Sequence, residues 1–277
     1  MTSQSGIRID VFDAAHLPDA HRLTTALKWA HRLEDWAFLQ ATARGFGAWN
    51  TDNALVGAAL WWPFGEKHGS VGMVVVSPDA QRAGIGRRLM AAIFEDAGSR
   101  SLQLVSTTAG LALYQALGFV TIGEVEQHQG IARLAPGQSR GGIRPITEAD
   151  FDTVAELDAR QLGYPRPEIL SRLMGIASGS VLLDGGRIAG FAFRRRFGAG
   201  SVIGPVVAET ETEATALVQS VLPDAEFARL DIPVEHVALR EWANERGLPA
   251  VSRGTVMLRG TLRRPSRSFA LISQAQG

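Results

Sequence analysis

A short loop with two glycines, in the segment SPDAQRAGIGRRLM at 77–90, joins the apolar run 72–76 to a predicted helix. The first turn of a helix exposes backbone N–H groups that have no partner inside the helix, and together with the helix dipole they attract anions. Gly84 and Gly86 have no side chain that would keep a phosphate away from this backbone. Further donors or positive charges stand beside them at Gln81, Arg82 and Arg87. The spacing therefore predicts a diphosphate site.

Several patterns compete for this loop, and one alternative is that its glycines only allow close packing. A Walker A loop needs Gly-Lys followed by Ser or Thr, which Arg87 and Arg88 do not supply. A dinucleotide fingerprint needs three glycines at a spacing that the segment 81–86 lacks. That segment, Gln-Arg-Ala-Gly-Ile-Gly, does fit a Gln/Arg-x-x-Gly-x-Gly/Ala loop between a strand and a helix.

A second motif follows the loop along the chain. Residues 113–119 read LYQALGF, and a strand is predicted at 102–105, between the loop and this motif. Together the two motifs resemble those of the GCN5-related N-acetyltransferases, the GNAT superfamily. The resemblance covers about residues 7–133, and the second half of the chain only in outline. It implies an acetyltransferase that uses acetyl-CoA as its co-substrate.

The resemblance also implies where acetyl-CoA would bind. The loop would hold the pyrophosphate through backbone N–H groups, and the strand end at Val74, Val75 and Val76 would pair with the pantetheine arm. A backbone N–H near Val74 would polarise the acetyl carbonyl, and Tyr114 would protonate the departing thiolate. Many relatives have Asn after the fifth strand, where this chain has Ser106-Thr107-Thr108, so this pantetheine contact departs from the family pattern. The predicted cofactor-binding residues are Val74, Val75, Val76, Gln81, Arg82, Ala83, Gly84, Ile85, Gly86, Arg87, Thr107 and Tyr114.

The implied reaction is a direct attack by a neutral amine, so a base or a water chain must take the ammonium proton. The family does not fix that base, and Glu66, His68 and Glu126 are also candidates by their places in the sequence. We predict His128, because EQHQG is expected on a strand that faces the cleft, and Glu34, because it lies in the helical region that covers the acceptor site in the family. The alternative is that His128 is an ordinary buried histidine and Glu34 a solvated surface charge. Tyr114 could likewise be a core aromatic residue at a helix end.

The predicted residues around the acceptor amine are three tryptophans and one acidic residue: Trp36, Trp61, Trp62 and Glu126. Adjacent residues of a strand point to opposite faces, so at most one of Trp61 and Trp62 is expected in the core. The other is expected to line a pocket or an interface. These residues favour a small-molecule amine with apolar or aromatic character.

The elements that must position these residues occur twice along the chain. FGAWNTDNALVGAALWW and SVLLDGGRIAGFAFRR both predict two strands joined by a tight turn, and HGSVGMVVVSP is matched by GAGSVIGPVVA. We therefore predict an α/β (mixed α+β) fold of two tandem GNAT-like domains, each with a mostly antiparallel, splayed sheet flanked by helices. The predicted boundaries are 1–134 for the first domain, 135–142 for a linker rich in Gly, Pro and Ser, and 143–277 for the second. The last segment, RRPSRSFALISQAQG, is expected either to close the second sheet or to reach across to the first domain.

The second copy lacks both marks of cofactor use. Its loop reads VAETETEATA, without glycine and with Glu209, Glu211 and Glu213, whose carboxylates would repel a diphosphate. Ala243 stands where the first copy has Tyr114. We predict a degenerate domain that supports the first domain, shapes its acceptor site or mediates formation of a homodimer.

Composition limits the classes of function. The chain has 277 residues, 28 of them basic and 28 acidic, so no net charge pulls it toward nucleic acid or a membrane surface. It contains no cysteine, and we predict no metal site. Neither a signal peptide nor a stretch of 18 apolar residues is present, so a cytoplasmic protein is expected.

Two classes of function remain. The first is an N-acetyltransferase that acts on the primary amine of a small molecule or on an amino-terminal amine. The second is a binding module, a sensor of CoA thioesters that has lost catalysis. Transfer of a longer acyl group is a variant of the first.

Overall fold

The computed structural model describes residues 6–134, 141–261 and 268–277, so most of the predicted linker at 135–142 lies outside the described residues. The strands are β1 Arg8–Val11, β2 Arg44–Trp49, β3 Leu55–Phe64, β4 His68–Val76, β5 Ser101–Ser106, β6 Val120–Ile131, β7 Ile143–Pro145, β8 Ser178–Asp184, β9 Arg187–Phe197, β10 Gly200–Val207, β11 Phe227–Pro233, β12 Ala250–Arg259 and β13 Ser268–Ala270. The helices are α1 Leu17–Ala26, α2 Leu33–Gln40, α3 Ile85–Ala97, α4 Leu111–Ala116, α5 Phe151–Leu162, α6 Pro167–Ile176, α7 Glu211–Val221 and α8 Val237–Glu245.

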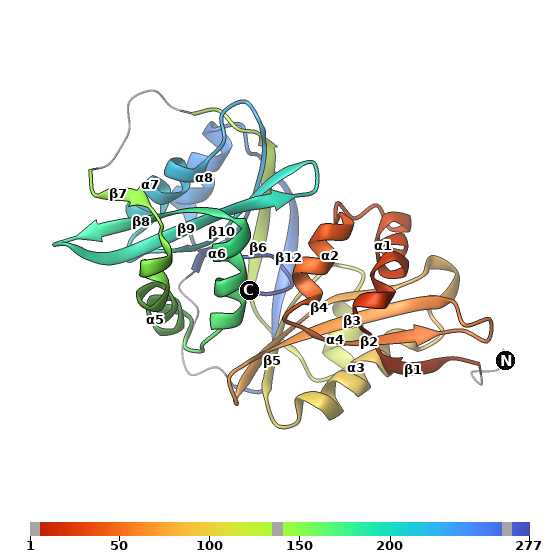
Figure 1. Cartoon of the computed structure of the whole chain (residues 1–277). Helices are drawn as coiled ribbons and strands as arrows, with labels where there is room; N and C mark the ends of the chain where they lie inside the picture. Colours follow the sequence, from red (N-terminus) through yellow and green to blue (C-terminus); the bar gives the residue numbers. More distant parts are fainter. Residues whose placement is uncertain (1–5, 135–140, 262–267) are drawn as a thin grey trace.

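One continuous sheet carries strands from both halves of the chain (Figure 1). Its order is β1-β2-β3-β4-β5-β12-β6-β11-β10-β9-β8-β7, with β13 beside β10. Most neighbours are antiparallel, while β4–β5 and β10–β11 are parallel pairs. The predicted mixed α/β fold is therefore confirmed.

The two halves exchange one strand each at the centre of this sheet. β12 from the second half lies between β5 and β6 of the first half. β6 in turn pairs with β11 of the second half. The predicted domains 1–134 and 143–277 thus have strands that interleave in one sheet. The boundaries at 134 and 143 remain a prediction about where along the sequence the two repeats divide.

Helices cover both faces of the sheet and bury both sets of alternating side chains. On one face, α1, α2, α5 and α6 share a core that runs across both halves and contains Trp62 and Phe191. On the other face, α3 packs over Trp61, and α7 packs over Ala192 in the second half. Because the inner strands are buried on both sides, they are apolar almost throughout, as the sequence of β3 shows.

The last described segment, 268–277, does both things expected of it. β13 pairs with β10, with Ala270 opposite Val206, and so extends the second half of the sheet. The chain then crosses toward the first half, where Ser70 Oγ donates a hydrogen bond to the Ala275 carbonyl oxygen at 2.7 Å. Figure 1 shows this end of the chain between the two halves. The segment 268–277 therefore connects the two halves, and it is called the tail below.

A buried ion pair anchors the end of the tail. Arg166, which is 1% exposed, binds Asp158 through Nε at 2.8 Å and Nη2 at 3.0 Å. Its Nη1 donates to the backbone oxygens of Gln276, at 3.3 Å, and Gly277. The end of the tail is thus held by Arg166, whose side chain is itself held in place by Asp158 of α5.

Candidate active site

β4 and β5 separate soon after they begin, which opens the sheet on the first half. Their parallel pairing covers only His68–Ser70 against Ser101–Gln103. Beyond it β4 stays with β3, and β5 stays with β12. The β3–β4 register shifts between Ala58 and Leu60, and Met73 in the facing stretch has φ +53°. A bulge of this kind turns backbone groups out of the ladder, here at the edge of a V-shaped gap.

The glycine-containing loop lies at the open end of this gap, between β4 and α3. Arg82 and Gly84 both have positive φ, +64° and +75°, which is the left-handed conformation that favours glycine. A Cβ added at Gly84 would meet nothing within 4 Å, so the space in front of this residue is open. The first helical bond runs from Arg88 N–H to the Gly84 oxygen at 3.1 Å, which leaves the N–H groups of the preceding turn directed out of the helix. This backbone fits an anion such as the pyrophosphate of CoA.

Gly86 has a different role from Gly84. A Cβ placed there would lie 3.2 Å from Leu113 Cδ2, so Gly86 lets α3 pack closely against α4. The two motifs found in the sequence therefore contact each other in the fold. Gly86 is thus explained by close packing of the two helices, whereas Gly84 faces open space.

The corresponding region of the second half is closed in two ways. The N-terminus of α7 is capped by its own side chains, because Glu213 N–H donates to Thr210 Oγ1 at 3.2 Å and Glu213 Oε2 accepts from Thr210 N–H at 3.1 Å. β10 is the strand of the second half that corresponds to β4. Its edge that would border an equivalent gap is paired with β13 of the tail. These contacts occupy part of the helix N-terminus and of the strand edge that correspond to the open region of the first half.

Tyr114 is mostly buried, at 8% exposure, at the end of α4. Its ring packs edge-on against Phe119, with centroids 5.9 Å apart. Burial raises the pKa of its hydroxyl to about 12, so the group stays protonated at neutral pH. A protonated hydroxyl is what a general acid needs, and the role predicted for Tyr114 remains a proposal.

A cavity of about 620 Å³ opens at the V-shaped gap and is called the acceptor cavity below. From the first half it is lined by Gly72 and Met73 at the bulge, by Thr107 after β5, and by Trp29 and His31 between α1 and α2. From the second half it is lined by Arg195, Phe197, Arg229, Asp231 and the tail residues Ser273, Gln274 and Ala275. Both halves are therefore needed to build it.

His128 and Glu126 do not face this cavity, so the predicted orientation of their strand is wrong. On β6 it is Gln127 and Gln129 that line the cavity, and residues between them point to the opposite face. His128 is completely buried there, with Nδ1 2.9 Å from the Leu248 oxygen and Nε2 3.3 Å from Glu126 Oε2.

Glu126 is occupied by two arginines from the second half. Its Oε2 accepts a hydrogen bond from Arg240 Nε at 2.7 Å, and its Oε1 accepts one from Arg253 Nη2. Burial alone would raise the pKa of Glu126, but these hydrogen bonds outweigh burial and lower it to about 2. Glu126 thus joins β6 to α8 and β12 and is not available to an amine in the cavity.

Glu34 is exposed on α2 and does not line the acceptor cavity. Its neighbour Asp35 is the buried carboxylate of this helix, at 1% exposure. Two arginines bind Asp35: Arg32 Nε lies 3.0 Å from its Oδ2, and Arg195 Nη1 lies 3.2 Å from its Oδ1. The helical surface predicted to carry a base therefore carries a structural ion pair between the halves instead.

The three tryptophans predicted around the acceptor are all core residues, each 0% exposed. Trp36 Nε1 donates to Thr24 Oγ1 at 3.0 Å, and Trp62 Nε1 to the Leu39 oxygen at 3.0 Å. Trp61 Nε1 donates to Asp96 Oδ2 at 2.8 Å on the opposite face of the sheet. The expectation that at most one of Trp61 and Trp62 is buried is wrong, because helices cover both faces of β3.

Comparison with known proteins agrees with this geometry. The Acetyltransferase (GNAT) family model matches residues 11–119, and an Acetyltransferase (GNAT) domain model matches residues 154–273. The chain belongs to the GNAT superfamily. It is a tandem GNAT acyltransferase, in which the two matched regions correspond to the two halves of the sheet.

Several relatives of this GNAT protein span nearly its whole length. It is 25% identical over 252 residues to the uncharacterized N-acetyltransferase YitH of Bacillus subtilis, covering 88% of this chain and 89% of the relative. It is 24% identical over 241 residues to the holothin acyltransferase of a Pseudoalteromonas strain, with coverages of 85% and 82%. A putative acetyltransferase from Pyrococcus horikoshii has the same fold, with a TM-score of 0.82 at 18% identity over 99% of this chain and 96% of that one.

Within residues 6–134, 141–261 and 268–277, no three His, Asp or Glu side chains gather as a metal site would require. In the same described residues, no helix is long and apolar enough to cross a bilayer.

Proposed function

We propose that this GNAT protein transfers an acetyl group from acetyl-CoA to the primary amine of a small molecule held in the acceptor cavity. The observation that carries the proposal is the continuity of the site. The gap that opens after Ser70, the cavity at Met73 and the open N-terminus of α3 follow one another along β4 and the loop after it. A cavity of about 620 Å³ is of the size that suits a small molecule rather than a folded protein.

Acetyl-CoA supplies the activated acetyl thioester, and the residues of the chain position it. The loop at 81–87 offers backbone N–H groups to the pyrophosphate, and the free edge of β4 at Val74–Val76 offers hydrogen bonds to an extended chain. Backbone N–H groups at the bulge stabilise negative charge that develops on the acyl oxygen. Tyr114 donates the proton that the departing thiolate needs.

The amine must be neutral when it attacks, and the charges of the cavity favour that state. Burial and then the positive charge of Arg229 lower the pKa of His31 to about 4, so a cation is disfavoured at this wall. An ammonium ion held in the cavity within reach of the Arg195 charge loses its proton more readily. The cavity thus contributes to deprotonation without the predicted bases His128 and Glu34.

The second half has direct support for one of its three predicted roles. Arg195, Phe197 and the tail residues Ser273–Ala275 form part of the acceptor cavity. Its own cofactor region is capped by Thr210 and Glu213 and filled by β13. We infer that it shapes the acceptor site of the first half and binds no acetyl-CoA.

The test is release of free CoA thiol with acetyl-CoA and a panel of primary amines. The proposal expects amine-dependent release by the wild type and none by Gly84→Glu, whose carboxylate would occupy the open space in front of α3. Binding of acetyl-CoA with no release for any amine would favour the alternative of a CoA-thioester sensor. The same assay with longer acyl-CoA molecules decides whether acetyl is the preferred group.

A further inference from the structure

One wall of the acceptor cavity combines aromatic rings with positive charge. Two guanidinium groups lie close to the ring of Phe197 on β9, with Arg195 Cζ 5.4 Å and Arg229 Cζ 5.2 Å from its centroid. His31 meets the same ring edge-on at 5.2 Å, and Trp29 lies 5.8 Å from His31. All of these residues line the cavity.

Arg229 does not offer free charge to a ligand. It binds Asp231 through Nε and Nη2, with Nη2 2.9 Å from both carboxylate oxygens, and Asp231 is 0% exposed. His31 adds no charge either, because burial and Arg229 keep it neutral. The positive charge left at this wall is therefore that of Arg195.

Arg195 is a buried cation with an incomplete set of partners. It is 3% exposed, and its Nη1 donates to Asp35 Oδ1 at 3.2 Å. Asp35 is shared with Arg32, whose Nε and Nη2 both lie at 3.0 Å, and with the Gly198 N–H at 3.2 Å. One carboxylate thus serves two guanidinium groups.

The remaining donors of Arg195 are unused. Within the described residues, its Nε and Nη2 are buried and have no hydrogen-bond partner, so a ligand in the cavity reaches them once the side chain turns toward it. Burial lowers the pKa of Arg195 to about 10, so the side chain remains charged at neutral pH. A buried charge without its full set of partners is costly, and an anion beside it would recover part of that cost.

We propose that the acceptor of this GNAT protein carries a carboxylate as well as its amine, that Arg195 binds the carboxylate, and that the body of the molecule packs against Phe197 and Trp29. A guanidinium recognises a carboxylate with charge-assisted hydrogen bonds. The amine end would then point to the bulge at Met73. This inference rests on the proposed function, because it names the substrate class of the same site.

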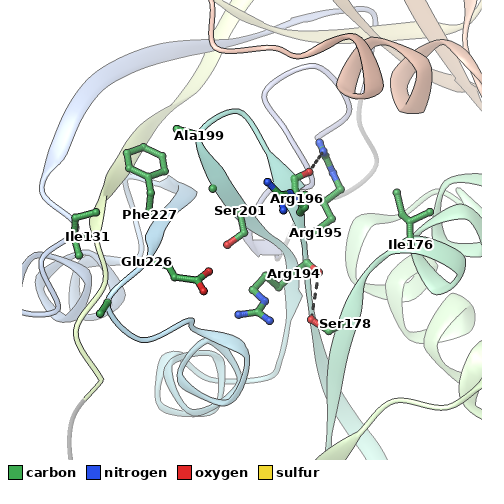
Figure 2. A pocket seen from close by; sticks show the side chains of 12 residues that line it. Ile131, Ile176, Ser178, Arg194, Arg195, Arg196, Ala199, Ser201, Glu226 and Phe227 are labelled. Carbon is green, nitrogen blue, oxygen red and sulfur yellow. Dashed lines mark hydrogen bonds between the residues drawn. The ribbon is translucent and has the colours of Figure 1, made fainter.

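The neighbour of Arg195 on the strand provides a matched control. Figure 2 shows Arg194 and Arg196 on the walls of a second pocket of about 590 Å³, with Arg195 reaching to the Arg196 backbone oxygen at 3.2 Å. Arg196 is exposed and does not line the acceptor cavity. Arg195→Met removes the charge from the cavity and keeps a long apolar side chain, and Arg196→Met removes the same charge outside it.

The test uses phenylacetate and phenylacetamide, which share an aromatic ring and differ in the carboxylate. Their dissociation constants for the acetyl-CoA-saturated protein are measured by ligand-observed NMR titration. We expect the wild type and Arg196→Met to prefer phenylacetate by about tenfold, which corresponds to about 1.4 kcal/mol. Arg195→Met is expected to bind both probes about equally. Thermal melting curves of both variants verify that they are folded.

Two results would overturn the inference. One is equal affinity of the wild type for the two probes, or no binding of phenylacetate at all. The other is a preference that survives in Arg195→Met. Failure of the proposed function is a separate outcome, because it would appear as no binding of acetyl-CoA in the same samples.

Discussion

Ser70 on β4 donates a hydrogen bond to the backbone oxygen of Ala275, at 2.7 Å, across 205 residues of chain. The contact lies where β4 and β5 separate, two residues before Gly72, the first residue of β4 that lines the acceptor cavity. Gly72 permits it, because a Cβ there would lie 2.5 Å from Ala275 Cβ. The tail is therefore part of the floor of the site in the other half of the protein.

Ser70→Ala is expected to destabilise the protein by about 1 kcal/mol, because the buried Ala275 oxygen loses its donor. The free energy of unfolding in urea measures the effect. Ser178→Ala is the matched control, since the exposed Ser178 Oγ lies 3.5 Å from its acceptor and its loss should change the free energy by only a few tenths of a kcal/mol. Equal effects of the two substitutions would contradict a role for the tail contact.

Gly84→Ala and Gly98→Ala separate backbone strain from cofactor binding at the two ends of α3. Both glycines have positive φ, +75° and +62°, and a Cβ at either would meet nothing within 4 Å. Each substitution should therefore cost about 1 kcal/mol of stability through strain alone. Only Gly84→Ala is expected also to weaken acetyl-CoA binding, by about tenfold. Equal affinities of the two variants would show that the open space at Gly84 is not the phosphate site.

Tyr114→Phe is expected to lower kcat by a factor of about 100 or more and to leave acetyl-CoA affinity nearly unchanged, as the loss of a general acid does. Because burial raises the pKa of Tyr114 to about 12, the activity of the wild type should show no loss from tyrosine ionisation below about pH 11. Tyr164→Phe is the control: it removes a hydrogen bond to Gln103 at 2.7 Å and should affect stability rather than kcat. A Tyr114→Phe enzyme with normal kcat would remove the tyrosine from the mechanism.

Glu126 should make the junction of the halves sensitive to acid. Its folded pKa is lowered from 4.5 to about 2, because hydrogen bonds from Arg240 and Arg253 outweigh the effect of burial. A depressed pKa gives a contribution that is complete above about pH 4.5 and is lost as the pH falls toward 2, up to about 3 kcal/mol.

Unfolding free energies measured between pH 6 and 3 test this sign. Glu126→Gln should lower the free energy at pH 6 and flatten its decline toward pH 3. Glu124→Gln, whose side chain is 42% exposed and pairs with the same Arg253, should change the profile little. A decline of unchanged slope in Glu126→Gln would contradict the assignment.

Local signals predicted much of the fold. The Gln81–Gly86 loop, the strand before it and the 113–119 motif have side-chain patterns that depend only on neighbours in sequence, and the structure brings the two motifs into contact at Gly86 and Leu113. The repeat of the strand and helix order predicted two GNAT units, which the family matches confirm. The exchange of β6 and β12 was not predictable, because either strand could pair within its own half with the same alternation of side chains.

The site was predicted less well, for two physical reasons. Successive residues of a strand point to opposite faces, so an error of one residue in the expected orientation exchanges the faces. Gln127 and Gln129 therefore face the cavity, while the predicted His128 between them faces away. The acceptor cavity is also built from residues far apart in sequence, such as His31 and Arg195. The run of arginines at 194–196 was the signal in the sequence that could have pointed to the cavity. Charged residues are rarely buried in a strand unless they have partners, so such a run marks a special site.

Calorimetric titration of acetyl-CoA into the wild type and Gly84→Glu tests the central claim most directly. We expect one molecule of acetyl-CoA per chain for the wild type, because the first half has an open helix N-terminus and strand edge, while β13 lies on the corresponding edge of β10 in the second half. We expect no binding to Gly84→Glu, with a thermal melting curve that shows the variant to be folded. Two molecules per chain, or undiminished binding to Gly84→Glu, would contradict it.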